Sequence, residues 1–472
     1  MRKIYALKIM KNLRPTYLQL IVLILFASSL AFAQTTGISL IDEKNVRAEM
    51  GFLASDAMQG RGSGTGYERI AAEYIGSQFY QFGLDPAGEP GWDGKPSYVQ
   101  TVEVKRPPRL DALKWDPTET SPFKLGKDWL ALTISSADIS GPLRKITLAG
   151  SVSPGEIVFV NLSDTDTQQS IQPKIAEFFK EGASAVLVRA SSDMKERWSQ
   201  LSDRKPAMSQ RGNVLVLSDD AAGVVSNFAD GTPIAVHAKF GEPERTHTWN
   251  AMGKITGSDP SLSSEIILLT SHLDHLGVRA NAPGDDKIFN GADDDASGSV
   301  AVLEMARVLG SGKKPKRTVY FVCFGSEEAG GYGAGWFVNN MPFPKDKLVA
   351  NLEFEMIGRP DDKVKPDELW LTGYERSNLG PELAKRGAKL VRDPHPDQNF
   401  FQRSDNIQLA RAGIIAHTVS SYGLHTDYHK ASDEIRTIDF VHMTRSINSM
   451  VEPVQWLINS DFKPAWNPGG KP

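Results

Sequence analysis

The stretch "SEIILLTSHLDHLG", residues 264–277, decides the class of fold. Its first part is a continuous apolar run, which is typical of a strand in a sheet that helices cover on both faces. Directly after that run come two histidines and an aspartate. The stretch therefore predicts a buried strand whose carboxyl end carries residues able to bind a ligand.

Apolar strands and helical patterns alternate after this first strand. The helical patterns lie at residues 297–310, 331–341, 378–390 and 440–458, and the strand-like runs at residues 317–326, 347–358 and 413–421. This order predicts an α/β fold with a mainly parallel sheet and helices on both faces. Because ligands gather at the carboxyl ends of strands in such sheets, residues that carry chemistry should cluster there.

The end of the first strand fits this expectation. His272 and Asp274 are two residues apart and share one face of an extended chain. A carboxylate beside a metal-binding histidine fixes its tautomer and raises its basicity, which is the role we expect for Asp274. His275 should point to the opposite face, and we interpret it as a structural residue.

Three consecutive aspartates follow in "NGADDDASG", residues 290–298. One aspartate is explained as a helix cap, which contributes about 0.3–1 kcal/mol. Three in a row repel one another and are not required for a cap. A bound divalent cation would turn this repulsion into attraction, and the small residues that follow allow a close approach of backbone and metal.

Further carboxylates and histidines follow the next strands. Glu327 and Glu328 are neighbours that point in different directions, so one can bind a metal while the other faces its water. Glu353 and Glu355 share one face of an apolar strand, where unpartnered charges are costly. The loop after the last strand supplies His425, Asp427, His429 and Asp433.

This set of histidine and carboxylate ligands suits zinc, with manganese or cobalt as alternatives. The number of ligands is sufficient for two ions that share one bridging carboxylate. Aminopeptidases and phosphatases use two metals in this way.

The ordered motifs "SHLDHLG … NGADDDASG … GSEEAG … EMIGR … YHKASD" resemble those of the di-zinc aminopeptidase family. Glutamate carboxypeptidase belongs to the same group, and the transferrin receptor and the glutaminyl cyclases are its relatives. The resemblance covers most of residues 250–436. It implies a zinc exopeptidase type of fold, and residues 52–84 are similar to the lead-in segment of the family.

The resemblance also implies a role for each site residue. Glu327 would be the general base, and Asp274 would lie behind His272. For the mechanism, and apart from the resemblance, we expect Tyr422 to donate a hydrogen bond to the oxyanion. Glu353 stays an alternative to Glu355, because many relatives carry aspartate there and the spacing differs. The implied zinc ligands are His272, Asp294 and Glu355 for one ion, and Asp294, Glu328 and His429 for the other, with a shared water.

The N-terminus predicts export. Residues 1–15 carry five basic residues and no acidic one, and an apolar run follows that ends in Ala31-Phe32-Ala33. This pattern is typical of a signal peptide cleaved after Ala33, with an uncleaved membrane anchor as the alternative. We therefore expect a periplasmic or extracellular protein without membrane contact after cleavage. The single cysteine, Cys323, excludes an internal disulfide and lies in an apolar run.

Short β-rich runs around one helical pattern occupy residues 113–245. They resemble a protease-associated domain. The predicted organisation is a signal peptide at residues 1–33, a zinc peptidase domain at 34–112 and 246–472, and this β-rich insert between the two parts. The formal charge of −4 and the lack of a basic stripe argue against a nucleic-acid partner.

The sequence thus predicts a secreted enzyme with two Zn²⁺ ions that hydrolyses peptide or protein substrates. An aminopeptidase that uses a metal-bridging water and Glu327 as general base is the first hypothesis. The alternatives are a carboxypeptidase, a dipeptidase or a glutaminyl cyclase on the same scaffold. A non-catalytic, receptor-like binding protein is the remaining alternative.

Overall fold

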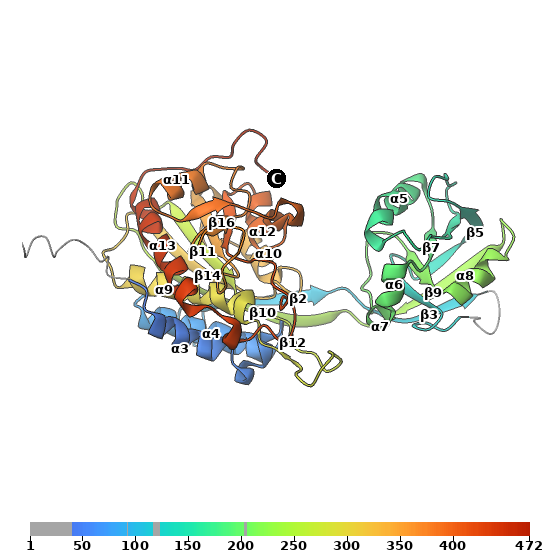
Figure 1. Cartoon of the computed structure of the whole chain (residues 1–472), viewed down its shortest axis with the longest axis horizontal. Coiled ribbons are helices and arrows are strands. Elements are labelled where there is room, and N and C mark those ends of the chain that lie inside the picture. The colour runs from blue at the N-terminus through green and yellow to red at the C-terminus, as the bar shows by residue number, and fades with distance from the viewer. Residues whose placement is uncertain (1–39, 92, 117–122, 203–204) are drawn as a thin grey trace, which may run out of the picture. The chain divides into compact units, whose positions relative to one another are not determined.

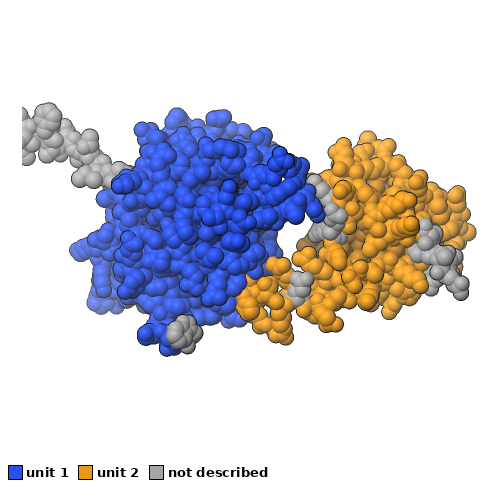
Figure 2. Space-filling view, turned by 90° about the horizontal axis from the view of Figure 1, so that it is seen from below, with its two compact units in different colours: residues 1–102, 248–472 blue, residues 103–247 orange. Residues whose placement is uncertain are grey.

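The computed structural model describes residues 40–91, 93–116, 123–202 and 205–472 (Figure 1). The predicted signal peptide, residues 1–33, lies outside the described residues. The chain forms two compact units, Met1–Val102 with Thr248–Pro472 and Glu103–His247 (Figure 2). Within the described ranges, no helix is both long enough and apolar enough to cross a membrane.

The larger unit is built on a mixed sheet with a parallel centre. Four neighbouring strands run parallel in the order β14 (Thr318–Phe324), β11 (Ile266–His272), β15 (Leu348–Phe354) and β18 (Ala416–Ser420). The strands outside these four include antiparallel pairs, so the sheet is parallel at its centre and mixed toward its edges. They are β1 (Asp85–Pro86), β2 (Val99–Arg106), β10 (Glu244–Ile255), β16 (Leu369–Leu371) and β17 (Leu390–Arg392).

Helices cover both faces of this sheet. In β11, Ile267 and Leu269 join the core on one face, whereas Ile266 and Leu268 join the core on the other. The first face is covered by α3 (Glu43–Leu53), α4 (Gly66–Gln81), α9 (Gly298–Gly310), α11 (Leu379–Lys385) and α13 (Phe440–Asn459). The second is covered by α10 (Tyr332–Asn339) and α12 (Asn406–Arg411).

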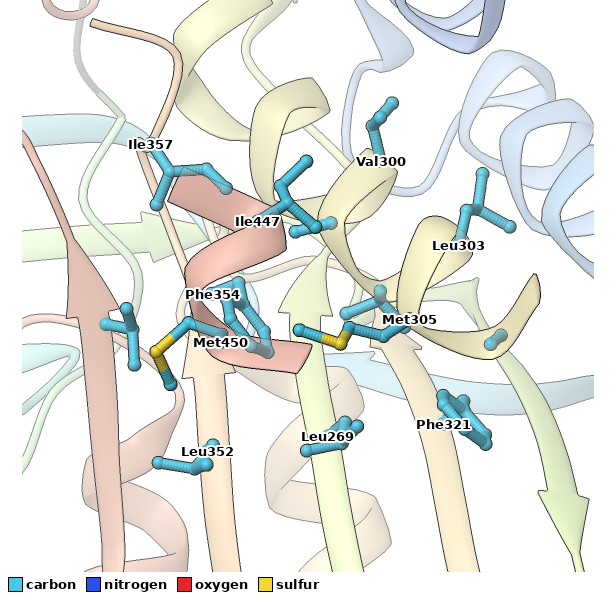
Figure 3. Packing of buried hydrophobic residues seen from close by; sticks show 14 of the residues in the cluster. Leu269, Val300, Leu303, Met305, Phe321, Leu352, Phe354, Ile357, Ile447 and Met450 are labelled. Atoms are coloured by element: carbon cyan, nitrogen blue, oxygen red, sulfur yellow. The ribbon is translucent and has the colours of Figure 1, made fainter. Parts of the chain in front are cut away.

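Figure 3 shows the core between the sheet and helices α9 and α13. Leu269, Phe321 and Leu352 come from three neighbouring strands, and Met305 and Met450 come from the two helices. Burying a side chain of this size stabilises the fold by about 1.5–3 kcal/mol. This packing holds the strands in register, so the residues that follow their carboxyl ends are brought to one edge.

The predicted elements are observed with local differences. The helix predicted at residues 378–390 ends at Lys385, and Gly387, with a φ of 97°, lets the chain turn into β17. The region before the first predicted strand forms α3 and α4, which are separated by a 3-10 turn, Asp56–Arg61. Cys323 is buried in β14, which raises its pKa to about 12 and makes it an inert thiol.

The smaller unit has its own sheet of parallel and antiparallel pairs, in the order β3-β9-β5-β6-β7-β8-β4. Its own hydrophobic core includes Trp115 and Trp129. The strands are β3 (Leu110–Asp116), β4 (Trp129–Thr133), β5 (Asp138–Ile146), β6 (Ile157–Val160), β7 (Ala185–Arg189), β8 (Val214–Leu217) and β9 (Pro233–Phe240). The helices are α5 (Gln168–Glu181), α6 (Ser192–Glu196), α7 (Trp198–Ser202) and α8 (Asp219–Ser226).

Candidate metal centre

Carboxylates and histidines converge at the carboxyl ends of β11, β14, β15 and β18. His272 is the last residue of β11, Glu327 and Glu328 follow β14, and Glu355 follows β15. His429 lies in the loop after β18. The parallel centre of the sheet therefore places at one edge residues that are up to 157 positions apart in the sequence, counted from His272 to His429.

The three consecutive aspartates have different partners. The carboxylate of Asp293 accepts a hydrogen bond from the Gly358 amide at 2.8 Å and lies 2.9 Å from Nε2 of His425. The carboxylate of Asp295 accepts hydrogen bonds from the amides of Gly298 at 2.9 Å and Met356 at 3.1 Å. Both side chains therefore tie loops together.

Asp294, the middle aspartate, instead faces other ligand-type side chains. Its Oδ1 lies 3.1 Å from Nε2 of His272, and its Oδ2 lies 3.2 Å from Nε2 of His429. Burial acts to raise the pKa of Asp294, but these two histidines outweigh it and hold that pKa well below its usual range. The two oxygens of one carboxylate thus point to two separate clusters.

The first cluster contains His272, Asp294 and Glu355, whose candidate ligand atoms all lie within 4.8 Å of one another. Glu353, the alternative ligand from the sequence, is engaged elsewhere. Its carboxylate accepts hydrogen bonds from Ser404, Asn406 and Thr418. The structure therefore places Glu355, and not Glu353, in the cluster.

The second cluster surrounds the other oxygen of Asp294. Oε1 of Glu328 lies 3.0 Å from Nε2 of His429, and the Glu328 and Asp294 carboxylates both face that ring. Burial opposes protonation of His429, but Asp294 and Glu328 outweigh it and raise its pKa to about 9. The ring of Tyr428 stacks on that of His429 with centroids 3.9 Å apart and fixes its orientation.

His275 is the residue that the sequence interpretation placed wrongly. It does not point away from the site. Its Nδ1 lies 3.0 Å from Oε1 of Glu328 and 3.8 Å from Oδ2 of Asp294, so its ring belongs to the second cluster. The alternation of faces that holds along an extended strand ends with β11 at His272, and His275 forms an isolated β-bridge with Gly62 instead.

Several buried polar atoms in the two clusters are arranged so that they could bind a cation. Nε2 of His272, both ring nitrogens of His275, Oδ2 of Asp294 and Oε1 of Glu328 have no hydrogen-bond partner within the described part of the chain. Nδ1 of His272 lies 3.2 Å from the carbonyl of Asp274, which only accepts, so Nε2 is the ring nitrogen that faces the Asp294 carboxylate. Nε2 of the neutral ring and the carboxylate oxygen could both bind one cation. The residues present therefore fit metal binding at both clusters.

Asp274 organises the loop that carries Glu327 and Glu328. Its carboxylate accepts the Glu327 amide at 2.9 Å, the Glu328 amide at 3.3 Å and the hydroxyl of Ser63. Its Oδ1 is 3.7 Å from Nδ1 of His272, longer than a hydrogen bond. The contact that orients the His272 ring comes from the Asp274 backbone instead.

Glu327 lies at the edge of the clusters without being part of either. Burial raises its pKa well above the usual range, and the nearby carboxylates of Asp405 and Glu355 add to this effect. A buried carboxyl group with a raised pKa is suited to accept and return a proton near neutral pH.

A small pocket adjoins Glu355. Aromatic side chains of Trp370, Phe400, Tyr422 and Tyr428 line it. Tyr422 is buried, and burial raises its pKa to about 12, so its hydroxyl group keeps its proton and can donate a hydrogen bond.

Sequence reasoning missed Arg61, a fully buried arginine in the 3-10 turn before α4. Its guanidinium donates to the carbonyls of Leu53, Leu273, Asn290 and Gly291 at 2.6–2.9 Å. These bonds tie the lead-in segment to the end of β11 and to the loop before the aspartates. An arginine between small residues in "GRGSGT" was the available signal.

Comparison with known proteins places this part of the chain in a family. Residues 250–452 match the family described as "Peptidase family M28". This segment belongs to peptidase family M28. The match includes β11, the three aspartates, Glu327, Glu328, Glu355 and His429, so both clusters lie inside the M28 segment.

The curated relatives match part of their length. Leupeptin-inactivating enzyme 1 of Streptomyces exfoliatus is 25% identical over 227 residues, 45% of this chain and 49% of the relative. Carboxypeptidase Q of Rattus norvegicus is 29% identical over 192 residues, 39% of this chain and 38% of the relative. The chain therefore spans about half or less of the length of these relatives.

Solved structures share the fold over most of the chain. An aminopeptidase from Aneurinibacillus sp. strain AM-1 has a TM-score of 0.58 and 18% identity, covering 89% of this chain and 94% of its own. BSAP, a zinc aminopeptidase from Bacillus subtilis, has a TM-score of 0.53 and 18% identity, covering 89% and 96%. At this identity the likeness shows a shared mixed α/β fold.

Proposed function

We propose that this chain is an exported zinc metallopeptidase that binds two zinc ions and releases N-terminal residues from peptides. The observation that carries the proposal is the position of Asp294, whose two carboxylate oxygens face two different clusters of histidine and glutamate. The M28 match and the zinc named for the Bacillus subtilis structure support zinc as the metal.

His272, Asp294 and Glu355 would hold one zinc ion, and Asp294, Glu328 and His429 would hold the other. When bound, such ions lower the pKa of a water molecule toward neutrality and polarise the scissile carbonyl group. Because its two oxygens face different clusters, Asp294 would be the carboxylate that the two ions share.

The chain's own groups supply the proton transfers. Glu327 accepts the proton of the attacking water and delivers it to the leaving amine, a role that its raised pKa supports. Asp274 holds the Glu327 and Glu328 amides and thereby positions both carboxylates. Tyr422 donates a hydrogen bond to the developing oxyanion from the wall of the aromatic pocket.

An acidic environment beside the first cluster favours a substrate with a free α-amine. The buried carboxyl group of Asp405 and the partly buried one of Glu355 lie near Glu327, and Oδ2 of Asp405 has no hydrogen-bond partner among the residues described. An ammonium group can pair with such carboxylates. The aromatic pocket would hold the adjoining side chain.

Carboxypeptidase activity is the second candidate, because carboxypeptidase Q is among the relatives of this chain. We also propose that residues 113–245 form an inserted domain of the protease-associated type. The separate core and sheet of the unit Glu103–His247 support this assignment. Export rests on the N-terminal pattern of residues 1–33.

A panel of aminoacyl chromogenic amides, assayed beside N-blocked versions, tests the direction of cleavage. We expect hydrolysis of the unblocked amides alone. Dialysis against a chelator should abolish this activity and added Zn²⁺ should restore it. Cleavage of blocked peptides with release of the C-terminal residue would favour the carboxypeptidase instead.

A further inference from the structure

We propose that His275 is a fourth protein ligand of the second metal ion, beside Asp294, Glu328 and His429. The inference rests on the proposed function, since it assigns a new residue to one of the two sites. The family pattern that this sequence resembles supplies three protein ligands for each ion. With His275, the second site would have four protein ligands and no free position. The first site would have three protein ligands and one free position.

The backbone of His275 is fixed on both sides. Its amide donates to the carbonyl of Arg61 at 3.2 Å, and its carbonyl accepts from the amide of Ser63 at 3.3 Å. Its ring rests against Gly291, which has a φ of 57°. A Cβ atom at Gly291 would overlap the His275 ring, so the glycine gives the ring its place against the backbone. The imidazole is therefore held toward the second cluster before any metal binds.

Four of the six distances among the ligand atoms are close to the edge length expected for one tetrahedral ion. Nδ1 of His275 and Nε2 of His429 each lie 3.0 Å from Oε1 of Glu328. Their distances to Oδ2 of Asp294 are 3.8 Å and 3.2 Å. For ligands about 2.0–2.1 Å from zinc, a tetrahedron has edges of roughly 3.3 Å. The observed distances bracket that length.

The two rings approach from different directions. Their centroids are 5.8 Å apart and their planes are inclined by 71°. Stacked rings would place their nitrogens side by side. Inclined rings that share one carboxylate oxygen can instead occupy two corners of a tetrahedron.

Hydrogen bonding alone does not account for His275. The residue is fully buried, yet neither ring nitrogen has a hydrogen-bond partner in the described part of the chain. The 3.0 Å contact with Glu328 lacks hydrogen-bond alignment, and Oε1 of Glu328 is itself without a partner. Buried polar groups are nearly always paired. A cation bound between the His275 ring and Oε1 of Glu328 would give these atoms a partner.

Among the residues that the structure describes, the first cluster has no corresponding fourth ligand. Glu353, the nearest candidate from the sequence, is occupied by Ser404, Asn406 and Thr418. Catalytic zinc sites keep three protein ligands and one open position, whereas structural sites use four protein ligands. The ion near His272 and Glu327 would then be the one that receives substrate, and the ion near His275 would bind first and more tightly.

The test measures zinc binding to the metal-free, full-length protein by competition with a chromophoric chelator. We expect the wild type to bind two ions, one of them tightly. His275→Gln should weaken the tighter site by 100-fold or more, beyond the 10–100-fold typical of losing a partner behind a ligand. His442→Gln is the matched control, because His442 is also buried but bonds only to the hydroxyl groups of Ser421 and Ser446. It should leave both affinities unchanged.

Wild-type affinities in a folded His275→Gln protein would overturn the inference and leave the proposed function standing. A wild type that binds no zinc, or one ion only, would instead contradict the proposed function.

X-ray absorption of the wild type loaded with one equivalent of Zn²⁺ tests the inference even if the variant fails to fold. Two imidazoles per zinc are expected, from His275 and His429, and a single imidazole would refute the assignment.

Discussion

Replacing Arg61 by methionine should destabilise the larger unit severely. The guanidinium of Arg61 donates to four backbone carbonyls, those of Leu53, Leu273, Asn290 and Gly291, and the side chain is 1% exposed. Methionine fills much of the same volume but donates no hydrogen bond. The Gly291 carbonyl keeps the Ala296 amide as a donor. Each of the other three buried carbonyls costs about 1–3 kcal/mol when it loses Arg61, so the loss is at least about 3 kcal/mol. Domains have a total stability of about 5–15 kcal/mol, and the variant would be close to unfolding.

Urea unfolding of the metal-free protein at pH 7, followed by circular dichroism, measures this loss. Arg69→Met is the control, since Arg69 lies on the exposed side of α4 and pairs only with Glu73 at 3.7 Å. An exposed pair of this type contributes about 0.3–0.5 kcal/mol. A loss below about 1 kcal/mol for Arg61→Met, or one equal to that of the control, would refute the claim that Arg61 holds these loops together.

Three further predictions concern the site and the core. Glu327→Gln should retain both zinc ions, measured by elemental analysis, and should have a kcat about 10²–10⁴-fold below that of the wild type. An unchanged turnover would show that Glu327 is not the general base. Asp274→Asn should lower kcat more than it raises KM. The backbone amides of Glu327 and Glu328 donate to different oxygens of Asp274, and an asparagine side chain has one oxygen only. A wild-type kcat would contradict this positioning role. Burial lowers the pKa of His417 to about 4, and its neutral ring bonds to Ser377 and Thr372. Because His417 of the unfolded chain binds a proton below about pH 6.5, its contribution to the free energy of unfolding falls as the pH drops below that value. Between pH 7 and pH 5, urea unfolding should show that the wild type loses about 2 kcal/mol more stability than His417→Gln. Equal losses in the two proteins would refute this role of His417.

The strand ends were predictable from the sequence because a continuous apolar run reports burial on both faces. His272 at the end of β11 and Glu327 after β14 follow directly from that pattern. The antiparallel edge strands were not predictable, since β16 has only three residues and its direction depends on long-range pairing with β18.

The site shows the same limit at the level of single side chains. The direction of His275 depends on its backbone bond to Arg61, which is far away in the sequence, and on the space that Gly291 leaves for its ring. The separate partners of Asp293 and Asp295 depend on backbone amides of Gly358 and Met356 from another strand end. A local pattern gives residue types and spacing, but it does not report which distant amides a carboxylate meets.

The division between the two units falls inside β2 and β10, after Val102 and after His247, and these two strands are hydrogen-bonded neighbours. The chain therefore leaves the larger unit through β2 and returns to it through the paired strand β10. The intervening stretch can be treated as an exchangeable cassette, and a two-residue hairpin turn such as Asn-Gly is a natural replacement for residues 103–247. Such a shortened protein would give a minimal scaffold on which peptidase chemistry could be engineered apart from its appended module.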